Sequence, residues 1–94
     1  MKNRQNGIEL ARKLGLPAAR GIEAVLKAQL ISAVVKETEA QELTHAELAK
    51  KSKLPRSAVT GILSGSLQKV TLDRILKLVE AVGLVPELKL HKIA

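Results

Sequence analysis

Hydrophobic residues recur along this chain at helical spacing, and the longest such run extends from Ala18 to about Gln41. Its apolar members are Ile22, Val25, Leu26, Leu30, Ala33 and Val34. A spacing of three and four residues places side chains on one face of an α-helix. We therefore expect a long scaffold helix that turns this stripe toward the core.

The next region, residues 44–65, has the pattern of two short helices separated by a break. Thr44 and Glu47 form a capping box, in which the Thr hydroxyl accepts a backbone N–H of the first turn and the Glu carboxylate accepts the N–H of Thr44. Residues 52–54 interrupt the periodicity, and Pro55 favours a new helix because it lacks an amide hydrogen and has a helical φ. This arrangement is typical of a helix-turn-helix.

The second of these short helices is predicted to be amphipathic. Val59 and Ile62 are three residues apart and should face inward, and Gly65 should end the helix in a left-handed conformation. The outer face then carries Arg56, Ser57, Thr60 and Gly61.

A further amphipathic run begins after Thr71, which is predicted to cap it, and ends at Gly83. Asp73 lies in its first turn, where the helix dipole favours negative charge. The predicted buried stripe is Leu72, Ile75, Leu76, Val79 and Val82.

The two ends of the chain have weaker patterns. Residues 1–17 are interrupted by Gly7, Gly15 and the Leu16-Pro17 step, so we expect a flexible basic arm with at most one short helix around residues 8–14. Residues 87–91 alternate apolar and polar positions, which predicts a short β-strand. Because the chain offers this strand no partner, we expect it to pair with a second copy.

These elements predict an all-α fold of four to five helices with a short C-terminal β-strand used in dimerisation. Ninety-four residues suffice for one small domain, here residues 18–94 after the arm, and packing with a second copy would enlarge its modest core.

Charge is unevenly distributed along the chain, whose formal net charge is +7. Counting Lys and Arg against Asp and Glu, residues 44–70 carry +4, residues 1–17 carry +3, residues 71–94 carry +1 and residues 18–43 carry −1. Basicity alone fits nucleic acid, anionic lipid or simple solubility. Its concentration on the two short helices favours nucleic acid, whereas the acidic character of the most apolar helix argues against a membrane-surface helix.

Composition removes several other classes of function. With no cysteine and two distant histidines, the chain offers no zinc site, and we expect no metal or cofactor. It has no Phe, Trp or Tyr on which single-stranded bases would stack, so duplex DNA is favoured.

No catalytic constellation is visible, so we do not expect an enzyme. No signal peptide and no apolar run of about 20 residues is visible either, so we expect a cytoplasmic location.

Residues 15–93 resemble the repressor-type helix-turn-helix proteins of the XRE class and, more narrowly, the HigA-like antitoxins. The resemblance rests on three motifs in order: Leu43-Thr44-x-x-Glu47-Leu48-Ala49; Ser57-x-Val59-Thr60 followed by Leu63-Ser64-Gly65; and Thr71-Leu72-Asp73-Arg74-Ile75 leading to Ala81-Val82-Gly83-Leu84. It implies a dimeric repressor whose second motif helix lies in the major groove. For the antitoxin branch it also implies a partner toxin, commonly an mRNA-cleaving ribonuclease, and repression of the operon that the two share.

Two positions depart from the pattern of that class. His45 stands where Gln is usual after the capping Thr, and it can donate to a phosphate in a similar way. Lys53 stands at a turn position that is typically Gly, and a positive φ at a non-glycine residue costs about 1–2 kcal/mol. Either the turn has another shape or a phosphate contact compensates for the strain.

The predicted DNA contacts follow from these placements. Arg56 would donate two hydrogen bonds to guanine, Thr60 would pack its methyl group on thymine, and Gly61 would admit the DNA closely; Ser57 completes the base contacts. The predicted phosphate contacts are Thr44, His45, Lys50, Lys51, Lys53, Ser66 and Lys69. Lys50, Lys51 and Lys53 have an alternative interpretation as a solvated helix face. Arg56 and Thr60 have an alternative interpretation as plain surface residues.

The predicted dimer contacts are Leu63, Val85, Leu88 and Leu90. Leu63 can equally be interpreted as a residue at the edge of the core rather than as a dimer contact. Two functional hypotheses follow: a sequence-specific dimeric repressor of duplex DNA, and an antitoxin whose residues 1–17 wrap a toxin. The alternative to the second is an XRE-type regulator without a toxin partner.

Overall fold

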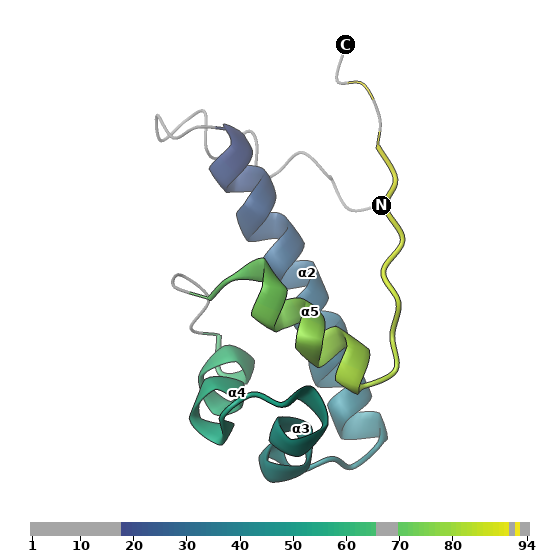
Figure 1. Ribbon diagram of the computed structural model, residues 1–94. Coiled ribbons are helices and arrows are strands. Elements are labelled where there is room, and N and C mark those ends of the chain that lie inside the picture. The colour runs from purple at the N-terminus through teal and green to yellow at the C-terminus, as the bar shows by residue number, and fades with distance from the viewer. Residues whose placement is uncertain (1–17, 66–69, 91, 93–94) are drawn as a thin grey trace.

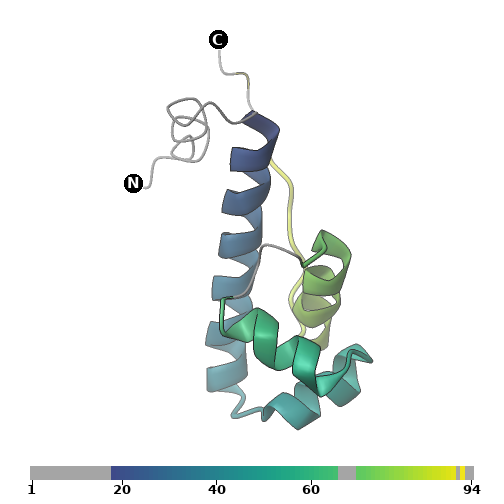
Figure 2. The ribbon, with the colours of Figure 1, turned by 90° about the vertical axis from the view of Figure 1, so that its left-hand side faces the viewer.

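The computed structural model describes residues 18–65, 70–90 and 92. Its helices are, in order, α2 (Ala18–Ala40), α3 (His45–Ser52), α4 (Arg56–Leu63) and α5 (Leu72–Ala81). The long α2 has α5 alongside it, while the shorter α3 and α4 lie near its C-terminal half (Figures 1 and 2). The all-α prediction is confirmed for this part of the chain. Within it, no helix has the length and apolarity needed to cross a membrane.

Helices α2 and α5 lie side by side and run in the same direction. Near the start of α5, Lys27 Nζ of α2 donates a hydrogen bond of 2.6 Å to the carbonyl of Val70. At the other end, Gln41 Nε2, just after α2, donates a hydrogen bond of 2.9 Å to the carbonyl of Val82. These two contacts hold α5 on the scaffold helix at both of its ends.

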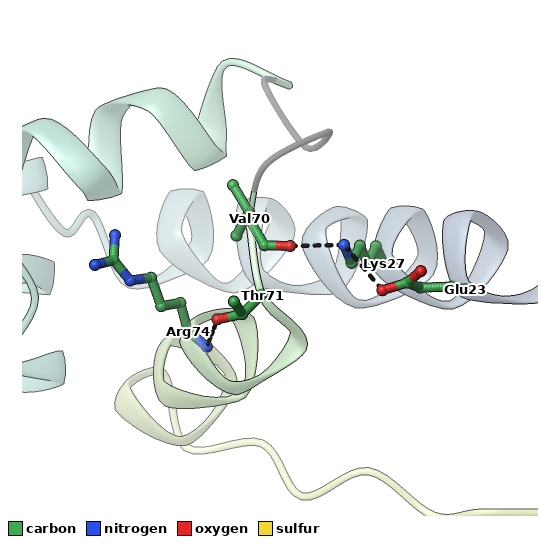
Figure 3. A network of polar contacts seen from close by, with 5 residues as sticks. All are labelled: Glu23, Lys27, Val70, Thr71 and Arg74. Atoms are coloured by element: carbon green, nitrogen blue, oxygen red, sulfur yellow. Dashed lines mark hydrogen bonds and ion pairs between the residues drawn. The ribbon is translucent and has the colours of Figure 1, made fainter. Parts of the chain in front are cut away.

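Lys27 is a buried cation whose hydrogen-bonding capacity is used within the fold. Its Nζ lies 3.2 Å from Glu23 Oε2, one turn earlier on α2, in addition to the bond to Val70 (Figure 3). A buried ammonium group needs such partners because its desolvation is costly. Lys27 thereby fixes the chain where it enters α5.

The hydrophobic core draws on all four of these helices. Val59 and Ile62 of α4 are buried, as their spacing predicted. Among the described residues, the buried apolar side chains are Ile31, Val34, Leu48, Leu54, Val59, Ile62, Ile75, Leu78, Val79 and Val82. Since α3 and α4 contribute to this one core, their mutual angle is fixed by packing rather than by the turn alone.

The cap of α5 is confirmed, but its predicted buried stripe is partly wrong. Thr71 Oγ1 accepts the N–H of Arg74 at 3.3 Å, and Gly83 ends the helix with a φ of +86°. Leu72 and Leu76, however, are 37% and 39% exposed, while Leu78, which the stripe omitted, is fully buried. Leu78 shares the core-facing side of α5 with its buried neighbours, whereas the two exposed leucines lie to one side of it.

The predicted stripe of α2 is displaced in the same way. Ile22 and Leu26 are 43% and 40% exposed, whereas Ile31 and Lys27 are buried and Val34 is buried as expected. The buried positions of this helix, Lys27, Ile31, Val34 and Thr38, lie on one face but include two polar side chains, so apolar spacing alone does not identify them.

The C-terminal strand predicted for residues 87–91 is not seen over residues 87–90, the part of it that the structure describes. Residues 84–90 form no strand, and Val85, Leu88 and Leu90 are 86%, 77% and 85% exposed. An extended segment becomes a strand only when a neighbour completes its hydrogen-bond ladder, and no described part of this chain does so. The segment instead runs along the side of α5 away from α4 (Figures 1 and 2). The predicted arm, residues 1–17, lies outside the described residues.

Candidate nucleic-acid interface

The first helix of the motif begins at the predicted capping box. Thr44 Oγ1 accepts the N–H of Glu47 at 3.0 Å, and Glu47 Oε1 accepts the N–H of Thr44 at 2.8 Å. Hydrogen bonds from the backbone and then the side chain of Thr44 hold the pKa of the Glu47 carboxyl below its ordinary value, and the charge of Lys51 adds to this. The carboxylate is therefore engaged locally at the helix start.

The turn between the two helices adopts the left-handed shape in spite of its lysine. Lys53 has φ 62° and ψ 25°, and it follows the last residue of α3. The Ser52 hydroxyl accepts the N–H of Leu54 at 3.3 Å, and the Leu54 side chain is buried in the core. Of the two alternatives for Lys53, a turn of another shape is therefore wrong, and the strain of the left-handed conformation is present.

Helix α4 begins one residue after its proline and exposes the predicted face. Pro55 is the extended N-cap, with φ −60° and ψ 145°. Arg56, Ser57 and Thr60 are all exposed, as the predicted base contacts require.

Gly61 is half-buried on α4 and is not required by the packing of the protein itself. A Cβ built at this position meets nothing within 4 Å, and its φ is not in the left-handed region. The glycine that ends the helix is different, because Gly65 has a φ of +96°, as its predicted cap role requires.

Several of the predicted phosphate contacts lie at exposed positions of α3, its cap and the turn before α4. Thr44, Lys50, Lys51 and Lys53 are exposed, and His45 is half-buried. The ion pairs of the described residues join Glu23 to Lys27 and Asp73 to Lys77, so none of them uses a cation of the motif. Ser66 and Lys69 lie outside the described residues. The basic side chains of α3 and the turn thus remain available for an external anion.

A contact between His45 and Thr60 was missed at the sequence level. Nδ1 of His45, the first residue of α3, lies 2.9 Å from Oγ1 of Thr60 in α4. The two residues are fifteen positions apart on different helices, so no periodicity within one helix links them. Only the packing of α3 against α4 brings the imidazole to the exposed face of α4.

The predicted dimer contacts fall in two environments. Leu63 is half-buried and packs against the hydrophobic core, in keeping with its alternative reading as an edge residue of that core. Val85, Leu88 and Leu90 project from the C-terminal segment into solvent.

Two short helices joined by a left-handed turn, the second with an exposed polar face and both packed on a common core, define a helix-turn-helix domain of the DNA-binding class. Residues 9–90 match a family described as a helix-turn-helix domain, and the chain belongs to this family. Searches of curated proteins and of solved structures gave no match.

Proposed function

We propose that the protein is a sequence-specific repressor of transcription that inserts α4 into the major groove of its operator. The observation that carries this proposal is the exposed polar face of α4, led by Arg56 and bordered by lysines that have no carboxylate partner among the described residues. A guanidinium at the start of such a helix matches the two acceptors of guanine, O6 and N7. Ser57, Thr60 and Gly61 would complete the contact with the base edges.

The surrounding groups are proposed to bind the phosphate backbone. Lys50, Lys51 and Lys53 would neutralise phosphates and set the salt dependence of binding, without choosing a sequence. Thr44 lies at the same end of α3 as His45, whose Nε2 has no hydrogen-bond partner among the described residues and would donate to a phosphate oxygen.

The repressor is further proposed to bind as a dimer to half-sites about one helical turn, roughly 34 Å, apart. The exposed apolar side chains Val85, Leu88 and Leu90 would bury their surface against the second copy. A chain that ends after Leu84 is then expected to sediment as a monomer and to lose cooperative binding to the paired half-sites. If the truncated chain remains a dimer, the dimer contact lies on another surface, such as α5.

Electrophoretic retardation of the DNA upstream of the protein's own gene tests the central proposal. We expect a complex that survives an excess of random duplex. Its formation should require a two-fold symmetric DNA sequence. Equal affinity for the upstream DNA and for random duplex would refute sequence-specific repression.

A second candidate function, that of an antitoxin, is favoured by apolar surface outside the motif. Ile22 and Leu26 lie one turn apart on α2, and Leu72 and Leu76 lie one turn apart on α5, with exposed fractions between 37% and 43%. Where such side chains form one contiguous patch, they mark a site of protein association. The resemblance to HigA-like antitoxins makes an mRNA-cleaving toxin the proposed partner, with residues 1–17 contributing to its binding.

Co-expression with the neighbouring gene tests the antitoxin proposal. We expect that gene to inhibit growth, and the protein to relieve the inhibition. Leu26→Asp with Leu72→Asp should abolish the relief while DNA binding persists, whereas Lys77→Ala, at another exposed position of α5, should leave both unchanged. A harmless neighbouring product would favour a regulator without a toxin. Full relief by the doubly substituted chain would show that these leucines do not bind the toxin, and full relief by a chain without residues 1–17 would show that the arm does not.

A further inference from the structure

The link between His45 and Thr60 joins a proposed phosphate contact to a proposed base contact. Nδ1 of His45 lies 2.9 Å from the hydroxyl oxygen of Thr60, within hydrogen-bond distance. Thr60 is exposed and His45 is half-buried, so the pair lies at the surface where α3 meets α4. The carboxylate of α3, that of Glu47, accepts the N–H of Thr44. The partner of His45 Nδ1 is therefore Thr60 and not this carboxylate.

The chemistry of a neutral imidazole couples its two nitrogens. One of them carries a hydrogen and donates, the other accepts, and the partner of either nitrogen sets the role of both. A phosphate oxygen at Nε2 can only accept, so the hydrogen must be on Nε2 and Nδ1 must be an acceptor. The Thr60 hydroxyl then has to donate its single hydrogen to Nδ1.

We propose that His45 determines which bases Thr60 can read. With Nε2–H on a phosphate, Thr60 presents to the major groove a methyl group and an acceptor oxygen, but no hydrogen-bond donor. This inference rests on the proposed function, since it requires α4 to lie in the groove. His45 is thus a positioning residue for specificity, which acts on the bases through Thr60.

The consequence is a defined preference at one base of each half-site. Thymine offers a methyl group, and adenine and cytosine offer amino hydrogens, so all three suit a methyl group or an acceptor. Guanine offers only the acceptors N7 and O6 in the major groove, so it is disfavoured opposite Thr60. Without the imidazole, the Thr60 hydroxyl is free to donate and this discrimination disappears.

Base preferences at every operator position, measured by binding to a randomised DNA library, test the proposal. Thr60→Ala identifies the position that Thr60 reads, because only there should the preference change. His45→Ala is expected to change the preference at the same position, raising the affinity for guanine relative to thymine by about fivefold. Its affinity for all sequences should also fall, because a phosphate contact is lost.

Lys50→Ala is the matched control, since this exposed residue of α3 has no hydrogen bond to α4 in the described part of the chain. It should weaken binding to all sequences alike and leave every preference unchanged. If His45→Ala behaves in the same way as Lys50→Ala, the proposal is overturned while DNA binding stands. If the wild-type chain prefers no sequence over random duplex, both the proposed function and this inference fall.

A measurement that does not depend on the folding of His45→Ala is the imidazole tautomer observed by nitrogen NMR. In a His91→Asn chain only one imidazole is present. On addition of operator DNA, we expect the hydrogen on Nε2 and an unprotonated Nδ1. A hydrogen on Nδ1 in the complex would overturn the proposal, because Thr60 would then keep its donor.

Discussion

The helix-turn-helix segment and the pair formed by α2 and α5 expose different kinds of surface. The segment exposes Arg56, Thr60 and the lysines of α3 and the turn, whereas α2 and α5 expose, among their charged residues, the large apolar side chains Ile22, Leu26, Leu72 and Leu76. The polar surface follows from short-range signals, because caps and a turn fix both helix starts within a few residues. The exposed apolar side chains of α2 and α5 follow from which side of each helix its neighbours cover. The comparison teaches that local signals locate the candidate DNA interface but do not locate the core face of a long helix.

The largest expected effect separates two leucines of α5. Leu78→Ala should lower the free energy of unfolding by about 2–5 kcal/mol, because it leaves a cavity at a fully buried position. Leu76→Ala, on the exposed side of the same helix, should cost less than about 1 kcal/mol. Urea unfolding followed by circular dichroism measures both. Similar losses for the two variants would mean that the exposed row is covered in solution.

The second effect separates two exposed arginines. Arg56→Ala should weaken operator binding by about 1–3 kcal/mol, because it removes two hydrogen bonds to guanine. Arg74→Ala on α5, whose side chain is also exposed, is the matched control and should change affinity little. Fluorescence anisotropy with labelled operator compares them. Equal losses would indicate that Arg56 contributes only charge.

The third prediction concerns the strained turn. Lys53→Gly should raise the free energy of unfolding by about 1 kcal/mol, because glycine adopts the left-handed conformation without steric cost. If Lys53 contacts a phosphate, the same change lowers DNA affinity and reduces its salt dependence. Thermal unfolding and a salt titration of binding report the two effects separately. A more stable variant with unchanged DNA binding would exclude the phosphate contact.

A somewhat smaller effect is expected at the glycine within α4. Gly61→Ala should stabilise the helix by up to about 1 kcal/mol, because the added Cβ meets nothing within 4 Å beyond its chain neighbours and the backbone of its own helix. If DNA approaches Gly61 closely, the methyl group should lower operator affinity in spite of the greater stability. An unchanged operator affinity would show that the DNA does not approach Gly61 closely.

The smallest effect is a pH dependence of the capping box. The folded-state pKa of Glu47 is below its ordinary value of 4.5, so its stabilising contribution is complete above that pH and is lost as the pH falls through the folded-state pKa. Glu47→Gln should flatten the decline in stability below about pH 4.5, with little change at pH 7. Chemical unfolding at a series of pH values measures this. An unchanged slope would mean that the box contributes no pH dependence.

Much of the fold was predictable because its signals are short-ranged. Thr44 with Glu47, Thr71 and Gly83 each act through hydrogen bonds or backbone preferences within a few residues, and the structure has each of them as predicted. The spacing of Val59 and Ile62 identified the buried side of α4, and with it the exposed side that carries the candidate base contacts.

The tertiary structure alone decided the remaining features. The sequence could not identify the buried side of α2, because that side carries Lys27 and Thr38 beside Ile31 and Val34 and only the placement of the other helices covers it. It predicted a strand for the C-terminal segment because alternation is visible locally, whereas the ladder partner that a strand requires is not. It could not bring His45 to Thr60, since contacts between residues on different helices are fixed by packing, which depends on the whole core at once.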